Sequence, residues 1–263
     1  MKITPILTLL CFLASGALAQ SSGLTRLTDR DDLFGWEAVG RVEQSGHGYC
    51  TGVLIAPDQV LTAAHCVYDQ NARLLSTDSL QFRAGLRDGV SVADRSVIQI
   101  AAHKGYNPKI RTSAQTIRYD VALLKLDSPI SSFEAAPFAL HRGISKGSRV
   151  SVVSYGRGRD AALSWQRDCG VLGRSRGLIT VDCDITYGSS GAPIFKKENG
   201  RGRILSLVSA GAVGEGPPLA WGMELPDLVQ ELKRDLRANR PATGAFGQSG
   251  GGFKREKVSN SGS

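Results

Sequence analysis

Short runs of apolar and polar residues, alternating or clustered over a few positions, make up most of the chain between residues 36 and 225. Glycine, asparagine, aspartate and proline separate these runs, a pattern typical of β-strands joined by turns. The predicted strands are Ala38 to Val42, Tyr49 to Ile55, Ser79 to Ala84, Val97 to Ala101, Val121 to Leu126, Arg149 to Ser154, Arg174 to Val181, Gly191 to Phe195 and Ile204 to Ala210. The pattern therefore predicts an all-β fold.

Two segments depart from this pattern. Residues 127–147 have little periodicity and contain Pro129, Pro137 and Gly143, which indicates a connection between two β-rich halves, about residues 35–130 and 145–225. One later segment has apolar residues at helical spacing after Pro226. These residues are Leu225, Leu228, Val229, Leu232 and Leu236. We predict a C-terminal helix, about residues 226–238, that packs on the second half.

The amino terminus has the pattern of a secretory signal peptide over residues 1–19. Lys2 precedes an apolar run that ends in Ala17-Leu18-Ala19, so we expect a mature chain that begins near Gln20. The run is too short to cross a bilayer core of roughly 30 Å as a helix, and no later segment is a candidate. We expect a secreted or periplasmic protein, monomeric, with no membrane span.

The segments that flank the predicted domain, residues 35–240, are poor in apolar residues. Residues 20–34 are polar and charged and are interpreted as an unpacked arm or a short pro-segment. Residues 241–263 are rich in glycine and serine, so burial there cannot offset the entropy lost on ordering. We predict a disordered tail.

Four cysteines remain after the leader, which contains Cys11: Cys50, Cys66, Cys169 and Cys183. An even number suits disulfide formation in an oxidising compartment, and three pairings are possible. Pairing neighbours in sequence closes two loops of similar length. A zinc site is the alternative, but there is no close Cys-x-x-Cys pair and His65 stands alone beside Cys66. We expect disulfides and no metal.

The formal net charge is +8, which is compatible with nucleic acid, an anionic surface or an acidic substrate as partner. The basic residues are scattered, so a solvated surface explains the charge better and no specific nucleic-acid partner is expected. Clusters at residues 233–240 and 254–257 allow weak adhesion to anionic polymers at low salt.

Three short segments carry the groups needed for attack on a carbonyl by a hydroxyl. Such attack requires a base, a carboxylate that orients the base, and N–H donors for the developing oxyanion. Residues 61–66 (LTAAHC) place His65 after an apolar strand, and residues 119–126 (YDVALLKL) place Asp120 at the start of another. Residues 188–193 (GSSGAP) place Ser190 in a turn flanked by glycine.

These segments resemble the TAAHC, D-[IV]-A-L-L and G-x-S-G-x-P boxes of the chymotrypsin and trypsin superfamily of serine endopeptidases. The chain order His, Asp, Ser agrees, whereas α/β-hydrolases run Ser, acid, His and subtilisins run Asp, His, Ser. The resemblance covers about residues 36–236, and its disulfide and pocket details are similar to those of secreted bacterial members. It implies two packed six-stranded antiparallel barrels with the active site in the cleft between them.

The resemblance also implies residue roles. Ser190 attacks the carbonyl, His65 accepts and returns the proton, and Asp120 holds the imidazole in the useful tautomer. The N–H groups of Gly188 and Ser190 form the oxyanion hole. Substrates are proteins or peptides, and no cofactor is implied.

For specificity, the resemblance assigns Asp184 to the base of the primary pocket, with Ser209, Gly211 and Gly222 along its wall, which favours arginine or lysine before the scissile bond. Glutamyl endopeptidases carry a similar Cys-Asp-x-x-x-Gly segment in which the acid is structural. Those enzymes place histidine before the wall, where this chain has Val208. Preference for glutamate or small residues stays as an alternative.

Two further implications concern the cysteines and Ser189. Pairing of Cys169 with Cys183 is similar to the bacterial branch rather than to trypsin. Trypsin has an aspartate at the position of Ser189, which receives the new N-terminal amine on activation. We expect a pocket that is preformed after folding, or one controlled by removal of part of residues 20–34. A noncatalytic binding protein on the same scaffold is the alternative function.

Overall fold

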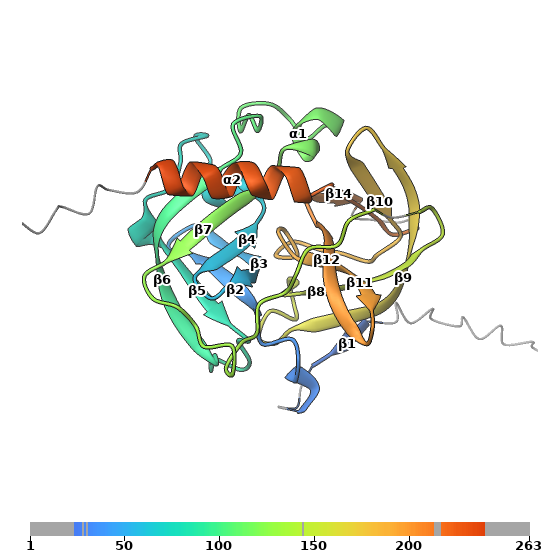
Figure 1. Cartoon of the computed structure of the whole chain (residues 1–263), viewed down its shortest axis with the longest axis horizontal. Coiled ribbons are helices and arrows are strands. Elements are labelled where there is room, and N and C mark those ends of the chain that lie inside the picture. Colours follow the sequence, from blue (N-terminus) through green and yellow to red (C-terminus); the bar gives the residue numbers. More distant parts are fainter. Residues whose placement is uncertain (1–23, 28, 30, 144, 213–216, 240–263) are drawn as a thin grey trace, which may run out of the picture.

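The computed structural model describes residues 24–27, 29, 31–143, 145–212 and 217–239. The predicted signal peptide and tail lie outside these residues. Strands predominate and form two β units that lie side by side (Figure 1). None of the described helices combines the length and apolar character that a bilayer-crossing helix needs.

The first unit is a closed antiparallel barrel, as predicted. Its strands, in order of pairing, are β2 (Val39–Gln44), β3 (Gly48–Ala56), β4 (Gln59–Thr62), β7 (Ala122–Leu126), β6 (Ala93–Ala102) and β5 (Leu80–Ala84). Each strand contributes apolar side chains that are nearly inaccessible to solvent, such as Val42, Val53 and Phe82. Burial of these residues inside the barrel explains why short apolar runs predicted the strands well.

The second unit is an eight-stranded sheet. Seven strands follow one another as β12 (Arg201–Leu207), β11 (Pro193–Glu198), β8 (Arg149–Ser154), β9 (Ser164–Ser175), β10 (Leu178–Val181), β14 (Leu219–Met223) and β13 (Ala210–Ala212), and β1 (Leu24–Arg26) pairs with β9. The Ser206 hydroxyl donates to the carbonyl of Met223 at 2.7 Å, so β12 and β14 also touch. The two ends of the sheet therefore approach each other. A second β unit is confirmed, whereas the predicted closed six-stranded barrel is shown only in part.

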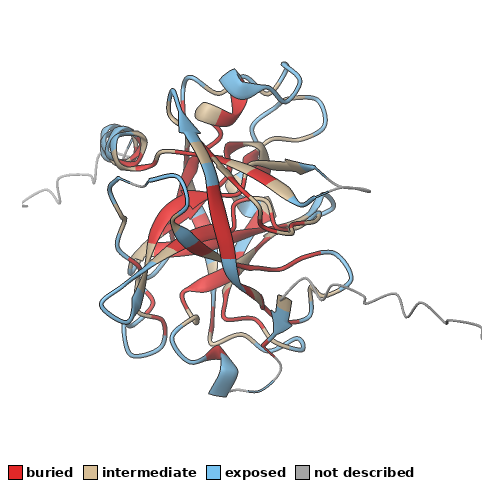
Figure 2. Ribbon diagram, turned by 90° about the vertical axis from the view of Figure 1, so that its right-hand side faces the viewer, coloured by how far each residue is buried: buried red, intermediate tan, exposed pale blue. Residues whose placement is uncertain are grey.

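Aromatic side chains join the two units into a continuous core. Trp36 lies 5.0 Å from Trp165 and 5.1 Å from Phe195, centroid to centroid, and Phe138 of the connection lies 4.6 Å from Phe195. Buried residues gather in the strands at the middle of the molecule, and exposed residues lie in the loops, on the helices and along the outer parts of strands (Figure 2). The units therefore hold a fixed relation to one another.

The amino-terminal arm is packed, and the prediction of an unpacked arm is wrong for the described part. Leu24 pairs with Gln166, and Leu27 is 2% exposed and donates its N–H to the carbonyl of Leu163 at 2.8 Å. Leu33, at the end of the 3-10 helix Asp31–Leu33, is also buried. Isolated leucines in a polar segment give no periodic signal, so only the partner strand reveals this packing.

The C-terminal helix α2 (Pro226–Ala238) forms where predicted but packs on the first barrel, so the predicted partner is wrong. Its Leu236 carbonyl accepts from Gln99 Nε2 at 3.0 Å, and Glu231 lies 3.1 Å from the ring of His103, both on the β6 side. The helical pattern identifies an apolar face, but it contains no information on which surface covers that face.

Other elements depart from the sequence pattern. The predicted strand from Arg174 to Val181 is a hairpin, since Arg176 and Gly177 turn the chain with φ of 49° and 79°. Strands β9, β13 and β14 and the helix α1 (Ala114–Arg118) were not predicted. Ser113 and Thr116 form a capping box at the start of α1. Two more 3-10 helices are Ala64–Val67 and Thr77–Ser79.

Candidate active site

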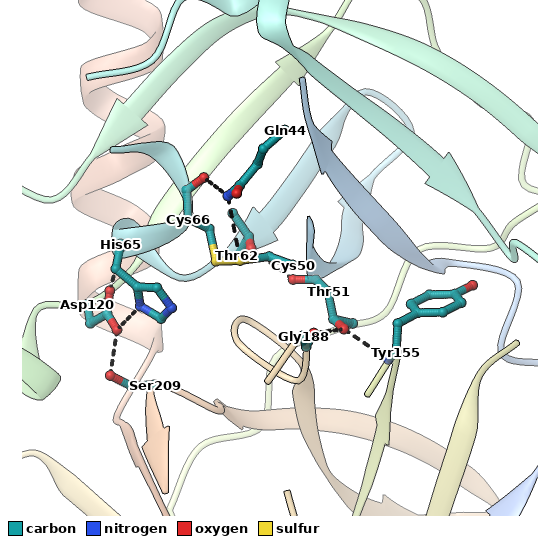
Figure 3. The surroundings of a disulfide bond; sticks show 10 residues. All are labelled: Gln44, Cys50, Thr51, Thr62, His65, Cys66, Asp120, Tyr155, Gly188 and Ser209. Carbon is teal, nitrogen blue, oxygen red and sulfur yellow. Dashed lines mark hydrogen bonds and ion pairs between the residues drawn. A yellow bond between two sulfur atoms is a disulfide. The ribbon is translucent and has the colours of Figure 1, made fainter. Parts of the chain in front are cut away.

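His65 and Asp120 form a hydrogen-bonded pair at the end of the first barrel. His65 lies on the 3-10 helix after β4, and Asp120 lies between α1 and β7. The backbone N–H of His65 donates to Asp120 Oδ1 at 2.8 Å, and the imidazole Nδ1 lies 2.7 Å from Oδ2 (Figure 3). Both contacts fix the ring relative to the carboxylate.

Ser209 supplies a third hydrogen bond to the same carboxylate. Its hydroxyl donates to Asp120 Oδ2 at 2.5 Å, and the Asp120 side chain is only 4% exposed (Figure 3). A buried carboxylate requires such partners, because its charge has lost most of its hydration. Ser209 was expected in the pocket wall, and its contact with Asp120 was not predicted. The contact reaches across the two β units, so the second unit helps to hold the charge of the first.

The electrostatics of the pair favour a proton on His65. Burial lowers the pKa of the imidazole, but the charge and hydrogen bond of Asp120 raise it, and the net pKa lies above its ordinary value. With Nδ1–H directed at Asp120, neutral His65 presents Nε2 as a free acceptor. The side chain remains 33% exposed, so this nitrogen can exchange a proton at the surface of the cleft.

A disulfide anchors the backbone next to His65. Cys50 of β3 is bonded to Cys66, and Gln44 donates to the Cys66 carbonyl (Figure 3). Cys169 is bonded to Cys183, so both expected pairings are confirmed. The donor atoms of Cys50, His65 and Cys66 lie within 4.8 Å of one another, but the two sulfurs are joined and offer no thiolate to a metal.

The turn that carries Ser190 is docked against the segment that precedes His65. The carbonyl of Ser190 accepts from the backbone N–H of Thr51 at 2.8 Å. Gly191 has φ of +75°, and a Cβ there would lie 2.3 Å from Thr62 Oγ1 and 2.8 Å from the nitrogen of Ala63. Only glycine permits this approach. The hydroxyl of Ser190 itself makes no hydrogen bond to any residue in the described ranges.

Two unused N–H groups lie in this turn. Within the described part of the chain, the N–H groups of Gly188 and Ser190 have no acceptor. The backbone N–H groups of the residues that follow each of them are used. Ser189 N–H donates to the carbonyl of Thr186 at 3.0 Å, and Gly191 N–H donates to the carbonyl of Val208 at 2.8 Å. Gly188 has φ of +87°. The turn thus leaves free the two donors that the resemblance assigns to an oxyanion.

Ser189 is fully buried and lies with its hydroxyl 3.1 Å from that of Ser154. A neutral pair of hydroxyls therefore stabilises this turn from below, with no charged group required.

The predicted pocket residues have different surroundings in the structure. Asp184 is half-buried, and its N–H donates to Gln166 at 2.7 Å. A Cβ on Gly211 would lie 2.3 Å from Ile185 Cδ1, so the Ile185 side chain fills space at this wall. A Cβ on Gly222 would lie 2.1 Å from the carbonyl oxygen of Leu207, so Gly222 permits close contact of strands.

Arg159 was missed by sequence analysis. Burial lowers the pKa of its guanidinium below the usual range, and the carboxylate of Asp184 opposes this effect. Its Nε and one terminal nitrogen are buried without a hydrogen-bond partner among the residues described. The side chain lies over Gly156, where a Cβ would be 2.6 Å from its Cζ. A cation thus lies close enough to Asp184 for the two charges to interact.

Comparison with known families agrees with this geometry. The family described as trypsin-like peptidase domain matches residues 50–202, which is more than half of the chain. The chain belongs to this family. The trypsin-like peptidase match includes His65, Asp120 and Ser190.

Two relatives illustrate the range of similarity. Glutamyl endopeptidase of Bacillus licheniformis is 25% identical over 183 residues, covering 69% of this chain and 55% of that protein. Serine protease 23 of Homo sapiens is 29% identical over 166 residues, covering 56% of this chain and 42% of that protein. The chain thus spans about half of the length of these curated relatives.

Solved structures show the same fold. A Glu endopeptidase in complex with MPD matches with a TM-score of 0.69 at 18% identity, covering 83% of this chain and 98% of that one. A thermostable serine protease, AL20, from an extremophilic microorganism matches with a TM-score of 0.64 at 17% identity, covering 78% and 98%.

Proposed function

We propose that this chain is a secreted or periplasmic serine endopeptidase with Ser190 as nucleophile, His65 as general base and Asp120 as the group that orients the base. The hydrogen-bonded His65–Asp120 pair carries this proposal. Docking of the Ser190 turn on the residues that precede His65 supports it. The two disulfides support an oxidising compartment.

The chemistry follows from the positions of these groups. Ser190 Oγ bonds to the carbonyl carbon as its proton moves to His65 Nε2, and the carbonyl oxygen becomes an oxyanion that the N–H groups of Gly188 and Ser190 stabilise. His65 then gives the proton to the leaving amine, which departs and leaves an acyl-enzyme. A water molecule then attacks the acyl-enzyme with the same proton transfers through His65 and releases the peptide carboxylic acid and free Ser190. Asp120 stabilises the imidazolium that forms twice per cycle.

A serine-directed fluorophosphonate tests the nucleophile. We expect it to label the protein on Ser190, detected as one adduct by intact mass and assigned by peptide mapping. Ser132→Ala is the matched control, since Ser132 is exposed in the connection between the β units, and this variant should keep the label. Absence of labelling on folded wild-type protein would favour a noncatalytic binding protein on the same scaffold.

For specificity, we propose that Asp184 receives an arginine or lysine side chain before the scissile bond. Asp184 is half-buried, and no ion-pair partner lies within 4.0 Å among the described residues. A carboxylate in partial burial gains from a charged partner, because charge-assisted hydrogen bonds are stronger than neutral ones.

A second candidate is preference for an acidic residue, favoured by Arg159. Its two unpartnered nitrogens lie near Asp184 and offer an anion the hydrogen bonds that they lack. The relative and the solved structure named as glutamyl endopeptidases are compatible with this candidate.

Paired variants separate the two candidates. If Asp184 binds the substrate cation, Asp184→Asn should lower kcat/KM for arginine peptides by about tenfold to a hundredfold. Arg159→Gln should then leave that value equal or higher, because it removes a competing cation. If acidic peptides are cleaved and only Arg159→Gln impairs them, the second candidate replaces the first. Steady-state rates on peptides that differ only in that residue give the comparison.

A further inference from the structure

A groove with a volume of about 760 Å³ lies beside the candidate active site, at the junction of the two β units. Helix α1 and the residues before it form one side, and the β9–β10 hairpin forms the other, with Gly211 and Trp221 at one end. Figure 1 shows α1 close to the ends of β10 and β14. Of the predicted pocket residues, Gly211 alone lines this groove, and neither Asp184 nor Arg159 does.

The groove is basic. Among the described residues its lining includes Arg118, Arg174 and Arg176 and no acidic side chain. Arg174 is neutralised, because Glu224 accepts from its Nε at 2.5 Å and from a terminal nitrogen at 2.9 Å. Arg118 and Arg176 have no hydrogen-bond or ion-pair partner among the described residues, and the Nε of Arg118 is buried. Two positive charges therefore line the groove with no compensating charge from the part of the chain that the structure describes.

Arg118 is held by the opposite side of the groove. A Cβ on Gly177 would lie 3.5 Å from its Cγ and Cδ, so the side chain packs on the hairpin turn that also carries Arg176. Arg176 is exposed on that turn with φ of 49°. The two arginines come from different β units, and both line the groove.

The groove also reaches a strand edge that can hold a peptide. Strand β13 is at the end of its sheet and pairs, among the described strands, only with β14. Ala210 and Gly211 of β13 line the groove, and the preceding residue, Ser209, is hydrogen-bonded to Asp120. An extended chain added at this edge advances about 3.3 Å per residue, so residues a few positions from the scissile bond would reach the arginines.

We propose that this groove binds an acidic side chain of the polypeptide substrate, about two to five residues from the scissile bond, through Arg118 and Arg176. The proposal rests on the peptidase function proposed above and deepens it. Carboxylates match the fork of a guanidinium, and the unpartnered Nε of Arg118 gains the hydrogen bond that it lacks. This subsite selects among peptide substrates by a side chain other than that of the residue before the scissile bond.

Peptides that differ at a single position test whether the groove binds an acidic side chain. Glutamate is compared with glutamine at each position within five residues on either side of one cleaved bond. At one or two of these positions we expect wild type to favour glutamate in kcat/KM by about fivefold to tenfold, and the preference to shrink with added salt. Arg118→Gln should reduce the preference about threefold to fivefold, Arg176→Gln about twofold, and the double variant should abolish it.

Charge and packing are separated by two further variants. Arg118→Lys keeps the positive charge and should retain most of the preference if the role is electrostatic. Lys197→Gln is the charge-matched control, because Lys197 is exposed on β11, outside the groove lining, and its loss should leave the preference unchanged. Equal preferences in wild type and the double variant would overturn the proposal, as would equal effects of Lys197→Gln and Arg118→Gln.

Binding to Ser190→Ala protein makes the result independent of turnover. The same glutamate and glutamine peptides, fluorescently labelled, are titrated by anisotropy with and without the Arg118→Gln change. If wild type hydrolyses no peptide but glutamate peptides bind more tightly through Arg118, the peptidase proposal fails and the groove stands. If hydrolysis depends on Ser190 but no glutamate preference exists in rate or binding, the groove proposal fails alone.

Discussion

Replacement of Ser190 with alanine is expected to lower kcat/KM for peptide hydrolysis by about 10⁴-fold or more, with no change in fold. The loss is large because the hydroxyl forms the covalent bond to the substrate, and the other members of the site cannot replace it. The Ser190 side chain makes no hydrogen bond to the described residues, so its removal breaks no structural contact. Steady-state hydrolysis of one peptide by wild type and variant from parallel purifications gives the ratio.

Two controls make this ratio informative. Ser132→Ala changes an exposed serine in the connection between the β units and should keep wild-type activity. Thermal unfolding should give the same midpoint for Ser190→Ala and wild type. Residual activity above about a tenth of wild type in the Ser190→Ala protein would remove Ser190 from the nucleophile role.

Asp120→Asn is expected to lower kcat about 10⁴-fold, the second largest effect. Asparagine keeps the size of the side chain, but its amide removes the negative charge that accepts from His65 Nδ1 and stabilises the imidazolium. The single amide oxygen can still accept from the His65 backbone N–H, and the amide NH2 in the place of Oδ2 can donate to the Ser209 hydroxyl and to His65 Nδ1, so the turn should keep its shape. Rapid-quench or steady-state rates at saturating peptide measure kcat directly.

The pH profile identifies the cause of the Asp120→Asn effect. His65 must be neutral to accept a proton, and Asp120 holds its pKa above the ordinary value, so activity falls as the pH drops through that raised pKa. Without the carboxylate, the acid limb should move to lower pH. Ser209→Ala keeps the charge and removes one hydrogen bond, so it should shift the limb far less. An unmoved limb in Asp120→Asn would show that another group controls it.

Strands with several buried apolar residues were predictable from the sequence, whereas other strands depend on their partners. Strand β8 has the predicted bounds, Arg149 to Ser154, because its apolar residues fill the interior of the second unit. Strand β9 contains Arg167, Asp168, Gly170 and Gly173, which give a loop-like pattern. It is a strand because β8, β10 and β1 supply its hydrogen-bond partners, and single-sequence patterns do not contain that information.

The site was predictable to the extent that it is carried by local motifs. The segments around His65, Asp120 and Ser190 each have a recognisable sequence, and the structure joins the first two by direct hydrogen bonds. The Ser209–Asp120 bond joins residues 89 positions apart, and Ser209 belongs to no strong motif. Arg159 likewise lies in a stretch with several arginines, where only its burial distinguishes it.

The strand β1 sets an order for folding during synthesis. Leu24 pairs with Gln166, so about 140 residues must be added after β1 before its partner exists. At a translation rate of roughly 5 to 20 residues per second, that wait lasts about 7 to 28 s. The first barrel, which ends at Leu126, is complete well before then. The edge formed by the earliest described residues is therefore among the last parts of the molecule to close, and cotranslational pulse proteolysis should find it cleavable after the first barrel has become resistant.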